Sequence, residues 1–134
     1  MLAWLVALSA FDIRERRLPN YLTLPGAVLV MVGAAIAGRG VAAVLGAAAL
    51  FAVYLVVHLL LPSAMGAGDV KLALGVGALT GSFGIDVWTL SALIAPLLTT
   101  GLILVAMLCR AGPAVPHGPS MCLAAVAGCA LVFI

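Results

Sequence analysis

Long apolar stretches alternate along the chain with short breaks of polar residues, glycine and proline. Six apolar runs result, at about 1–13, 21–37, 41–61, 70–85, 88–109 and 119–134. Each run predicts a helix, because backbone groups in lipid must bond within their own segment and no run shows the alternation of a barrel strand. The fourth run is short and rich in glycine, so its limits are left open. The pattern predicts an all-α polytopic membrane protein of about six transmembrane helices.

The composition places these helices in a lipid bilayer. Of the 134 residues, 66% are hydrophobic and only 7% are charged, against about 25% charged in ordinary soluble domains. A soluble protein of this size cannot bury so much apolar surface, whereas a bilayer covers it. The net charge of +2 is too small and too scattered for nucleic-acid binding. The runs leave no room for a second domain, so we expect a single transmembrane domain over 1–134.

The first ten residues, MLAWLVALSA, raise the question of a cleaved signal peptide. The stretch lacks the positively charged start of such peptides, and its small residues lead directly into Asp12. We interpret it as a retained first helix. The 11 residues before Asp12 span about 17 Å of helix, which is short against a hydrocarbon core of roughly 30 Å. Continuing the helix beyond Asp12 places this residue near one edge of the membrane.

The positions of lysine and arginine predict the orientation of the helices. The arginines of the first loop (residues 14–17), Lys71 and Arg110 are separated by even numbers of crossings, so they share one membrane face. Arg39 lies alone on the other face. Because basic loops face the cytoplasm, the shared face is predicted to be cytoplasmic and both termini to be outside. The expected location is the cytoplasmic (inner) membrane, crossed several times.

The acidic residues are the main candidates for chemistry, because carboxylates at membrane depth are costly and suggest function, pairing or an ion path. They are Asp12, Glu15, Asp69 and Asp86. The predicted topology places Asp12 and Asp69 at the cytoplasmic ends of the first and fourth helices. Asp86 follows Asp69 by 17 residues, about 25 Å of helix, and falls at the opposite face. Asp86 is therefore excluded as the partner of Asp69.

Two carboxyl groups brought together in a low-dielectric site suit an aspartic protease. One keeps its proton and hydrogen-bonds the scissile carbonyl, while the ionised one takes a proton from water. A covalent mechanism has less support, because Ser63 has no evident base and His58 and His117 lack an acidic partner in the sequence. Sequence spacing alone does not show that Asp12 and Asp69 meet.

The residues around Asp69 are small, and two of them are glycines. We expect Gly66 and Gly68 to let the backbone take unusual angles where a loop opens into a helix, and to let a peptide approach closely. GAGDVK is not a phosphate-binding loop, since it lacks the third glycine and the Lys-Ser/Thr ending. The three cysteines form no metal-binding pattern, so we expect no metal and no cofactor.

Three segments occur in an order typical of a known family. They are FDIRERRLPNYLT at 11–23, GAGDVKLALG at 66–75 and VPHGPSMCLAA at 115–125. Together they resemble the type IV prepilin peptidases, the GxGD intramembrane aspartic proteases, over essentially the whole chain. The resemblance implies a catalytic pair at Asp12 and Asp69. It implies supporting positions at Gly66, Gly68, Lys71, Pro19 and Asn20.

The resemblance also implies a reaction and a partner. The family removes the short basic leader of type IV pilin precursors at the cytoplasmic membrane surface, after a glycine and before the apolar pilin helix. The paired C-x-x-C region of bifunctional bacterial members is absent from this sequence, which argues against zinc binding and N-terminal methylation. The chain is most similar in outline to the minimal peptidases of Flp/Tad-type pilus systems, or to an archaeal enzyme of that kind.

Two other functions remain open from the residues alone. A small proton- or ion-coupled transporter or channel fits intramembrane acids and glycine-broken helices, but it predicts carboxylates spread through the membrane. A scaffold subunit held by small-residue contacts predicts that both aspartates can be replaced without effect. Gly77 and Gly81 form the GxxxG spacing of such a close helix contact.

Overall fold

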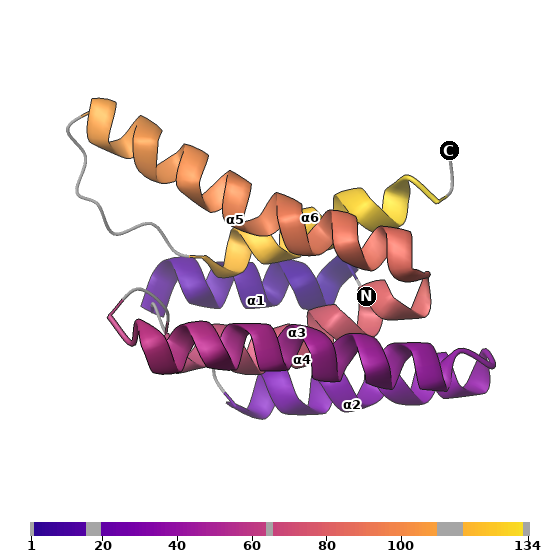
Figure 1. The fold of residues 1–134 in the computed structure, drawn as a ribbon. Coiled ribbons are helices and arrows are strands. Elements are labelled where there is room, and N and C mark those ends of the chain that lie inside the picture. Colours follow the sequence, from indigo (N-terminus) through magenta and orange to yellow (C-terminus); the bar gives the residue numbers. More distant parts are fainter. Residues whose placement is uncertain (1, 16–19, 64–65, 110–116, 133–134) are drawn as a thin grey trace.

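A computed structural model describes residues 2–15, 20–63, 66–109 and 117–132. Within these ranges the backbone forms six α-helices and no strand, which confirms the all-α prediction (Figure 1). The helices are α1 (Leu2–Glu15), α2 (Asn20–Ile36), α3 (Gly40–Leu60), α4 (Ala67–Ser82), α5 (Ile85–Leu108) and α6 (Gly118–Ala130).

The fourth and fifth helices begin earlier than the apolar runs indicated. They start at residues 67 and 85 rather than 70 and 88. In both cases the additional turn carries an aspartate, Asp69 in α4 and Asp86 in α5. A prediction from apolar runs misses such a turn because the turn contains a charged residue. A carboxylate is nevertheless favourable there, because the first turn of a helix exposes free backbone N–H groups.

Consecutive helices run in opposite directions through the bundle (Figure 1). One end of the bundle therefore collects the last turns of α1 and α3 and the first turns of α2, α4 and α6. The central helix is α4, which packs against α2, α3, α5 and α6. Its residues from Val70 to Gly81 are almost all buried. The helix that begins at Asp69 is thus held on several sides.

Glycines let α3 and α4 pack with their backbones in contact. A Cβ atom on Gly77 would lie 2.5 Å from the carbonyl oxygen of Gly46, and one on Gly81 would lie 2.7 Å from the carbonyl oxygen of Ala42. Lipid provides no hydrophobic drive for helix association, so close packing of small residues is what holds such helices together. The predicted close contact at Gly77 and Gly81 is confirmed.

Trp4 ties the first helix to its neighbours through a second pair of glycines. Its ring lies against Gly26 of α2 and Gly75 of α4, where a Cβ atom on Gly75 would be 2.5 Å from the ring. The indole N–H donates a hydrogen bond of 2.9 Å to the carbonyl oxygen of Leu22. Two turns further along α1 lies Asp12, so this contact helps to fix the position of that residue.

The fifth helix leaves the bundle in its second half. Its buried residues, Val87, Ser91 and Ala95, all precede Pro96. Beyond that proline the helix leans away from α3 and α4 (Figure 1). Proline lacks the N–H that would continue the helical ladder, so a bend at this position is expected. The first half of α5 therefore anchors the helix and the second half extends away from the other helices.

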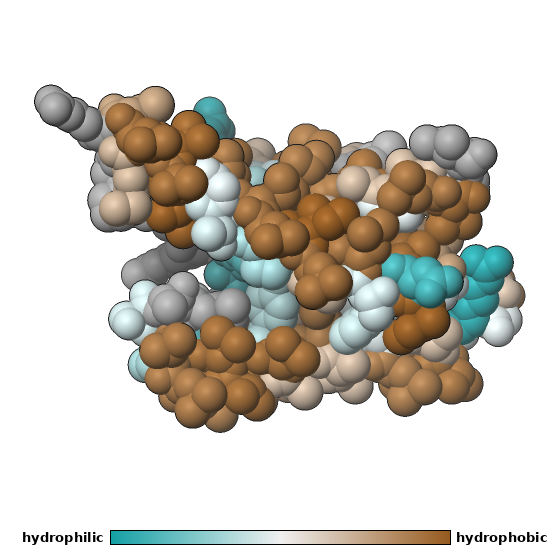
Figure 2. Space-filling view, turned by 45° about the horizontal axis from the view of Figure 1, so that its top comes forward, coloured by the Kyte–Doolittle hydropathy of each residue, from teal (hydrophilic) through white to brown (hydrophobic). Residues whose placement is uncertain are grey.

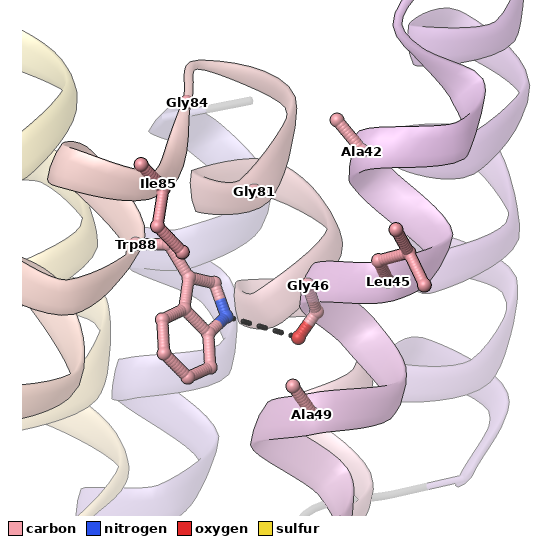
Figure 3. Close-up of a pocket in the computed structure, with 8 residues that line it drawn as sticks. All are labelled: Ala42, Leu45, Gly46, Ala49, Gly81, Gly84, Ile85 and Trp88. Atoms are coloured by element: carbon pink, nitrogen blue, oxygen red, sulfur yellow. Dashed lines mark hydrogen bonds between the residues drawn. The ribbon is translucent and has the colours of Figure 1, made fainter.

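An apolar groove of about 310 Å³ lies between α3, α4 and the start of α5, far from Asp69 along α4. Trp88 of α5 closes one side, and its indole N–H donates a 3.0 Å hydrogen bond to the carbonyl oxygen of Gly46 (Figure 3). This bond binds α5 to the glycine contact between α3 and α4. The groove thus marks the end of the bundle opposite the acidic pair.

The surface of the protein is largely apolar, as the prediction of a membrane protein requires. Among the described residues, α3 and α5 are long and apolar enough to cross a bilayer, and most of their residues are exposed rather than packed inside. Figure 2 shows hydrophobic side chains covering much of one face of the molecule. The other helices are shorter, with 14, 17, 16 and 13 residues in α1, α2, α4 and α6. Six crossings and the outside position of both termini therefore stay predictions.

Candidate active site

Asp12 is a buried carboxyl group near the end of α1. Leu5, Leu8 and Asp12 follow a spacing of three and then four residues, so they share one face of the helix. All three are buried, and only 7% of Asp12 is exposed. Asp12 therefore lies on the same buried face of α1 as Leu5 and Leu8. It is at the end of the bundle where α2, α4 and α6 begin.

Asp69 lies in the first turn of α4, ahead of the apolar part of that helix. Its carboxylate accepts a hydrogen bond from the backbone N–H of Gly66, the N-cap residue. Its own N–H donates to the carbonyl oxygen of Gly66 at 3.1 Å. An acidic side chain that reaches back to the N-cap N–H is half of a capping box. The Gly-x-Gly-Asp segment thus forms a helix cap that fixes the carboxyl group.

The expectation that Gly66 and Gly68 need unusual backbone angles is wrong. Gly66 has φ −76° and ψ 151°, an ordinary extended conformation, and Gly68 lies within regular helix. The reason is that Gly66 serves as an N-cap, a position that favours extended angles. A Cβ atom on Gly66 would lie 4.0 Å from the carboxylate Oδ2 of Asp69. Glycine here leaves that side of the carboxyl group uncovered.

The two carboxyl groups lie within electrostatic range of each other, although they are far apart in the sequence. The pKa of Asp69 is raised from 3.8 to about 6, first by burial and then by the negative charge of Asp12, while the Gly66 N–H acts in the opposite direction. Two carboxyl groups coupled in this way titrate as a pair, so one can hold a proton while the other is ionised. Such a pair can supply an acid and a base at once.

One hydrogen bond joins the two motif segments. The ammonium Nζ of Lys71, one turn into α4, donates a 2.8 Å hydrogen bond to Oδ1 of Asn20 at the start of α2. This bond joins the segment that follows Asp12 to the segment that contains Asp69. Pro19 lies outside the described residues. Asp86 is exposed in the first turn of α5, the helix turn next to the groove at the other end of α4, in agreement with its exclusion as a partner.

Three polar residues that the sequence left without a role lie at the same end of the bundle. The Tyr54 hydroxyl is 3.0 Å from Nε2 of His117, and Nδ1 of His117 is 2.5 Å from Oγ1 of Thr99. Tyr54 is buried and lies within electrostatic range of Asp69. The sequence offered little indication that Tyr54 lies near the site, because a single tyrosine in an apolar helix is usually a packing residue. His117 was visible, but its partners on α3 and α5 were not.

The side of α6 that faces Asp12 also carries polar groups. Cys122 lies within range of the charge of Asp12 and is hydrogen-bonded to Ser9 of α1. Ser120, in the first turn of α6, is fully buried, and its hydroxyl has no hydrogen-bond partner among the described residues. No group of three or more His, Cys, Asp or Glu side chains suited to a metal ion occurs within the described ranges.

Comparison with known proteins identifies the family. Residues 1–108 match the type IV leader peptidase family. The matched range contains both aspartates, Asn20 and Lys71, the residues that the bundle gathers at one end. No curated protein and no solved structure matches the chain. The match includes the first two of the three motif segments, whereas the third, at 115–125, lies outside it. The chain belongs to the type IV leader peptidase family.

Proposed function

We propose that this protein is a membrane aspartic endopeptidase that removes the leader from type IV pilin-like precursors. Membership of the leader peptidase family supports a peptidase. The observation that carries the aspartic mechanism is the coupling of Asp12 with Asp69, each contributed by one motif segment. A pair of carboxyl groups that shares a proton is what hydrolysis without a covalent intermediate requires.

In the proposed reaction, water attacks the scissile carbonyl between the two carboxyl groups. The ionised carboxylate takes a proton from the water, and the protonated carboxyl group donates a hydrogen bond to the carbonyl oxygen as it becomes an oxyanion. When the C–N bond breaks, the leaving amine takes up a proton from the pair. Each turnover returns the two groups to their starting state of one proton between them.

The proposed setting is the cytoplasmic face of the inner membrane, with a single domain over 1–134 that crosses it six times. The alternating directions of the six helices support this arrangement. So does the charge distribution, because Arg14 and Lys71 lie at the end that holds the aspartates, whereas Arg39 lies at the other. Pilin-like precursors of the Flp/Tad type are the proposed substrates.

The test is cleavage of a synthetic precursor by the purified protein in lipid vesicles. The peptide carries a basic leader, a glycine and an apolar helix, and mass spectrometry identifies the products. We expect one cut directly after the glycine, and an Asp86→Asn variant is expected to cut equally well. Proton or ion flux across the vesicles without any cleavage would instead favour the transporter. Neither cleavage nor flux in a folded protein would favour a scaffold.

A further inference from the structure

Two apolar grooves run along α3, one on each side of Leu45. The first is the groove of about 310 Å³ between α3, α4 and the start of α5, with the ring of Trp88 as one wall (Figure 3). The second, of about 590 Å³, lies between Met31 and Ala35 of α2 and Val44 of α3. Leu45 lines both grooves, so they are neighbours. Their linings contain no charged side chain.

Both grooves reach the end of the bundle at which α3 and α5 begin. Gly40, the first residue of α3, lines the second groove, and Gly84, directly before α5, lines the first. Arg39 lies between these two points. It directly precedes Gly40, and its guanidinium donates a 3.4 Å hydrogen bond to the carbonyl oxygen of Ser82, two residues before Gly84. A cation is therefore held at the end that the two grooves share.

Arg39 retains most of its capacity to bind an anion. A guanidinium group has five N–H donors, and the bond to Ser82 uses one of them. The carbonyl partner is neutral and the side chain is exposed, so the positive charge is accessible. Guanidinium groups bind phosphate oxygens well because two N–H groups can donate side by side. Asp86, in the first turn of α5, adds a negative charge at this end, so the anion that fits is a single phosphate group at Arg39.

The length of α3 places Arg39 at the level of lipid headgroups. The helix has 21 residues, which span about 31 Å, and the hydrocarbon core of a bilayer is roughly 30 Å thick. Arg39 directly precedes this span. From there the first groove follows α3 from Ala42 to Ala49 (Figure 3), about 10 Å along the helix axis. A phospholipid has the matching shape, because two acyl chains extend from one phosphate-bearing headgroup.

We propose that Arg39 and the two grooves bind one diacyl phospholipid. Arg39 holds the phosphate group, and one acyl chain lies in each groove, on either side of Leu45. The chain in the first groove contacts α3, α4 and α5 together, so the lipid braces these helices at the end opposite Asp69. This site takes no part in the proposed cleavage, and its existence does not depend on the proposed function.

The phosphate contact is tested with lipids that differ only in that group. The delipidated protein in detergent is titrated with phosphatidylglycerol or with diacylglycerol of the same chains, and native mass spectrometry counts the bound molecules. We expect one tightly bound phosphatidylglycerol, with diacylglycerol about fivefold weaker. Arg39→Gln is expected to weaken phosphatidylglycerol by the same factor and to leave diacylglycerol unchanged. Inorganic phosphate at equal concentration is expected not to displace the lipid.

The grooves are tested with two neighbouring alanines of α3. Ala49 lines the first groove, whereas Ala48 lines neither, and both are exposed, so a larger side chain overpacks no core. Ala49→Leu is expected to fill the first groove and to reduce phosphatidylglycerol binding to the level at which the wild type binds the single-chain lysophosphatidylglycerol. Ala48→Leu adds the same atoms outside the grooves and is expected to bind as the wild type does.

Each contrary result overturns a stated part of the proposal. Equal binding of phosphatidylglycerol and diacylglycerol, or an equal loss of both in Arg39→Gln, would overturn the phosphate contact. Equal binding by Ala48→Leu and Ala49→Leu would overturn the groove as the place of an acyl chain. Displacement of the lipid by inorganic phosphate would reduce the site to one for a free anion, and a lipid-free dimer would assign the grooves to a second copy of the chain.

Discussion

Replacement of Asp12 or Asp69 by Asn is expected to abolish leader cleavage, with a loss of about 10⁴-fold or more in rate. Asn has nearly the same shape as Asp, so both helices keep their packing. Its amide N–H can donate a hydrogen bond, but the amide cannot take a proton from water or transfer one to the leaving amine. Either substitution leaves a single carboxyl group at the site. The rate is measured with the synthetic precursor in vesicles.

The double variant separates a joint mechanism from two independent contributions. Groups that act as a unit lose their effect together, so Asp12→Asn with Asp69→Asn is expected to be no slower than either single variant. Asp86→Asn is the matched control, because it alters a carboxylate in the same position of a helix, the first turn, at the other end of the bundle. Retention of a tenth of the wild-type rate by either single variant would contradict the paired mechanism.

The second large effect is expected at the glycine contact between α3 and α4. Gly77→Ala would place a methyl group 2.5 Å from the Gly46 carbonyl oxygen and 3.0 Å from Cα of Ala47. Both are backbone atoms that cannot move aside, so the helices must separate. We expect a loss of about 3 kcal/mol in stability, the upper end of the cost of overpacking. Thermal unfolding of the purified protein in detergent measures it.

A second glycine gives the control for this prediction. Gly33 of α2 has no atom within 4 Å of the position that a Cβ would take. Gly33→Ala is therefore expected to leave stability unchanged or to raise it by about 0.5–1 kcal/mol, because alanine favours the helix. Equal stability of the Gly77 and Gly33 variants would show that α3 and α4 do not pack as described.

The helices and the identity of the acidic pair follow from the sequence to a large extent. Continuous apolar runs predict helices because lipid leaves the backbone no other way to bond. The burial of Asp12 agrees with its spacing from Leu5 and Leu8. The start of α4 was harder to predict from the sequence. Its first turn contains Asp69 and is stabilised by a helix cap rather than by apolar residues.

The surroundings of the pair could not be predicted from the sequence. Which residue of α3 comes within electrostatic range of Asp69 depends on the position along the two helices at which α3 and α4 cross. The helices cross where Gly46 of α3 contacts Gly77 of α4. The sequence marks Gly77 as part of a GxxxG spacing with Gly81, but it does not mark Gly46. The same holds for His117, whose two partners lie on α3 and α5. Contacts of this kind depend on three helices at once.

The central claim is that the carboxyl groups of Asp12 and Asp69 lie together and share a proton. Its most direct test is an NMR titration of Asp69, with ¹³C in the aspartate carboxyl groups, in the wild type and in Asp12→Asn. We expect a midpoint near pH 6 in the wild type. Removing the negative charge of Asp12 makes Asp69 easier to ionise, so the midpoint falls in the variant but stays above 3.8, because burial still opposes the charge. The same midpoint in both proteins would contradict the claim.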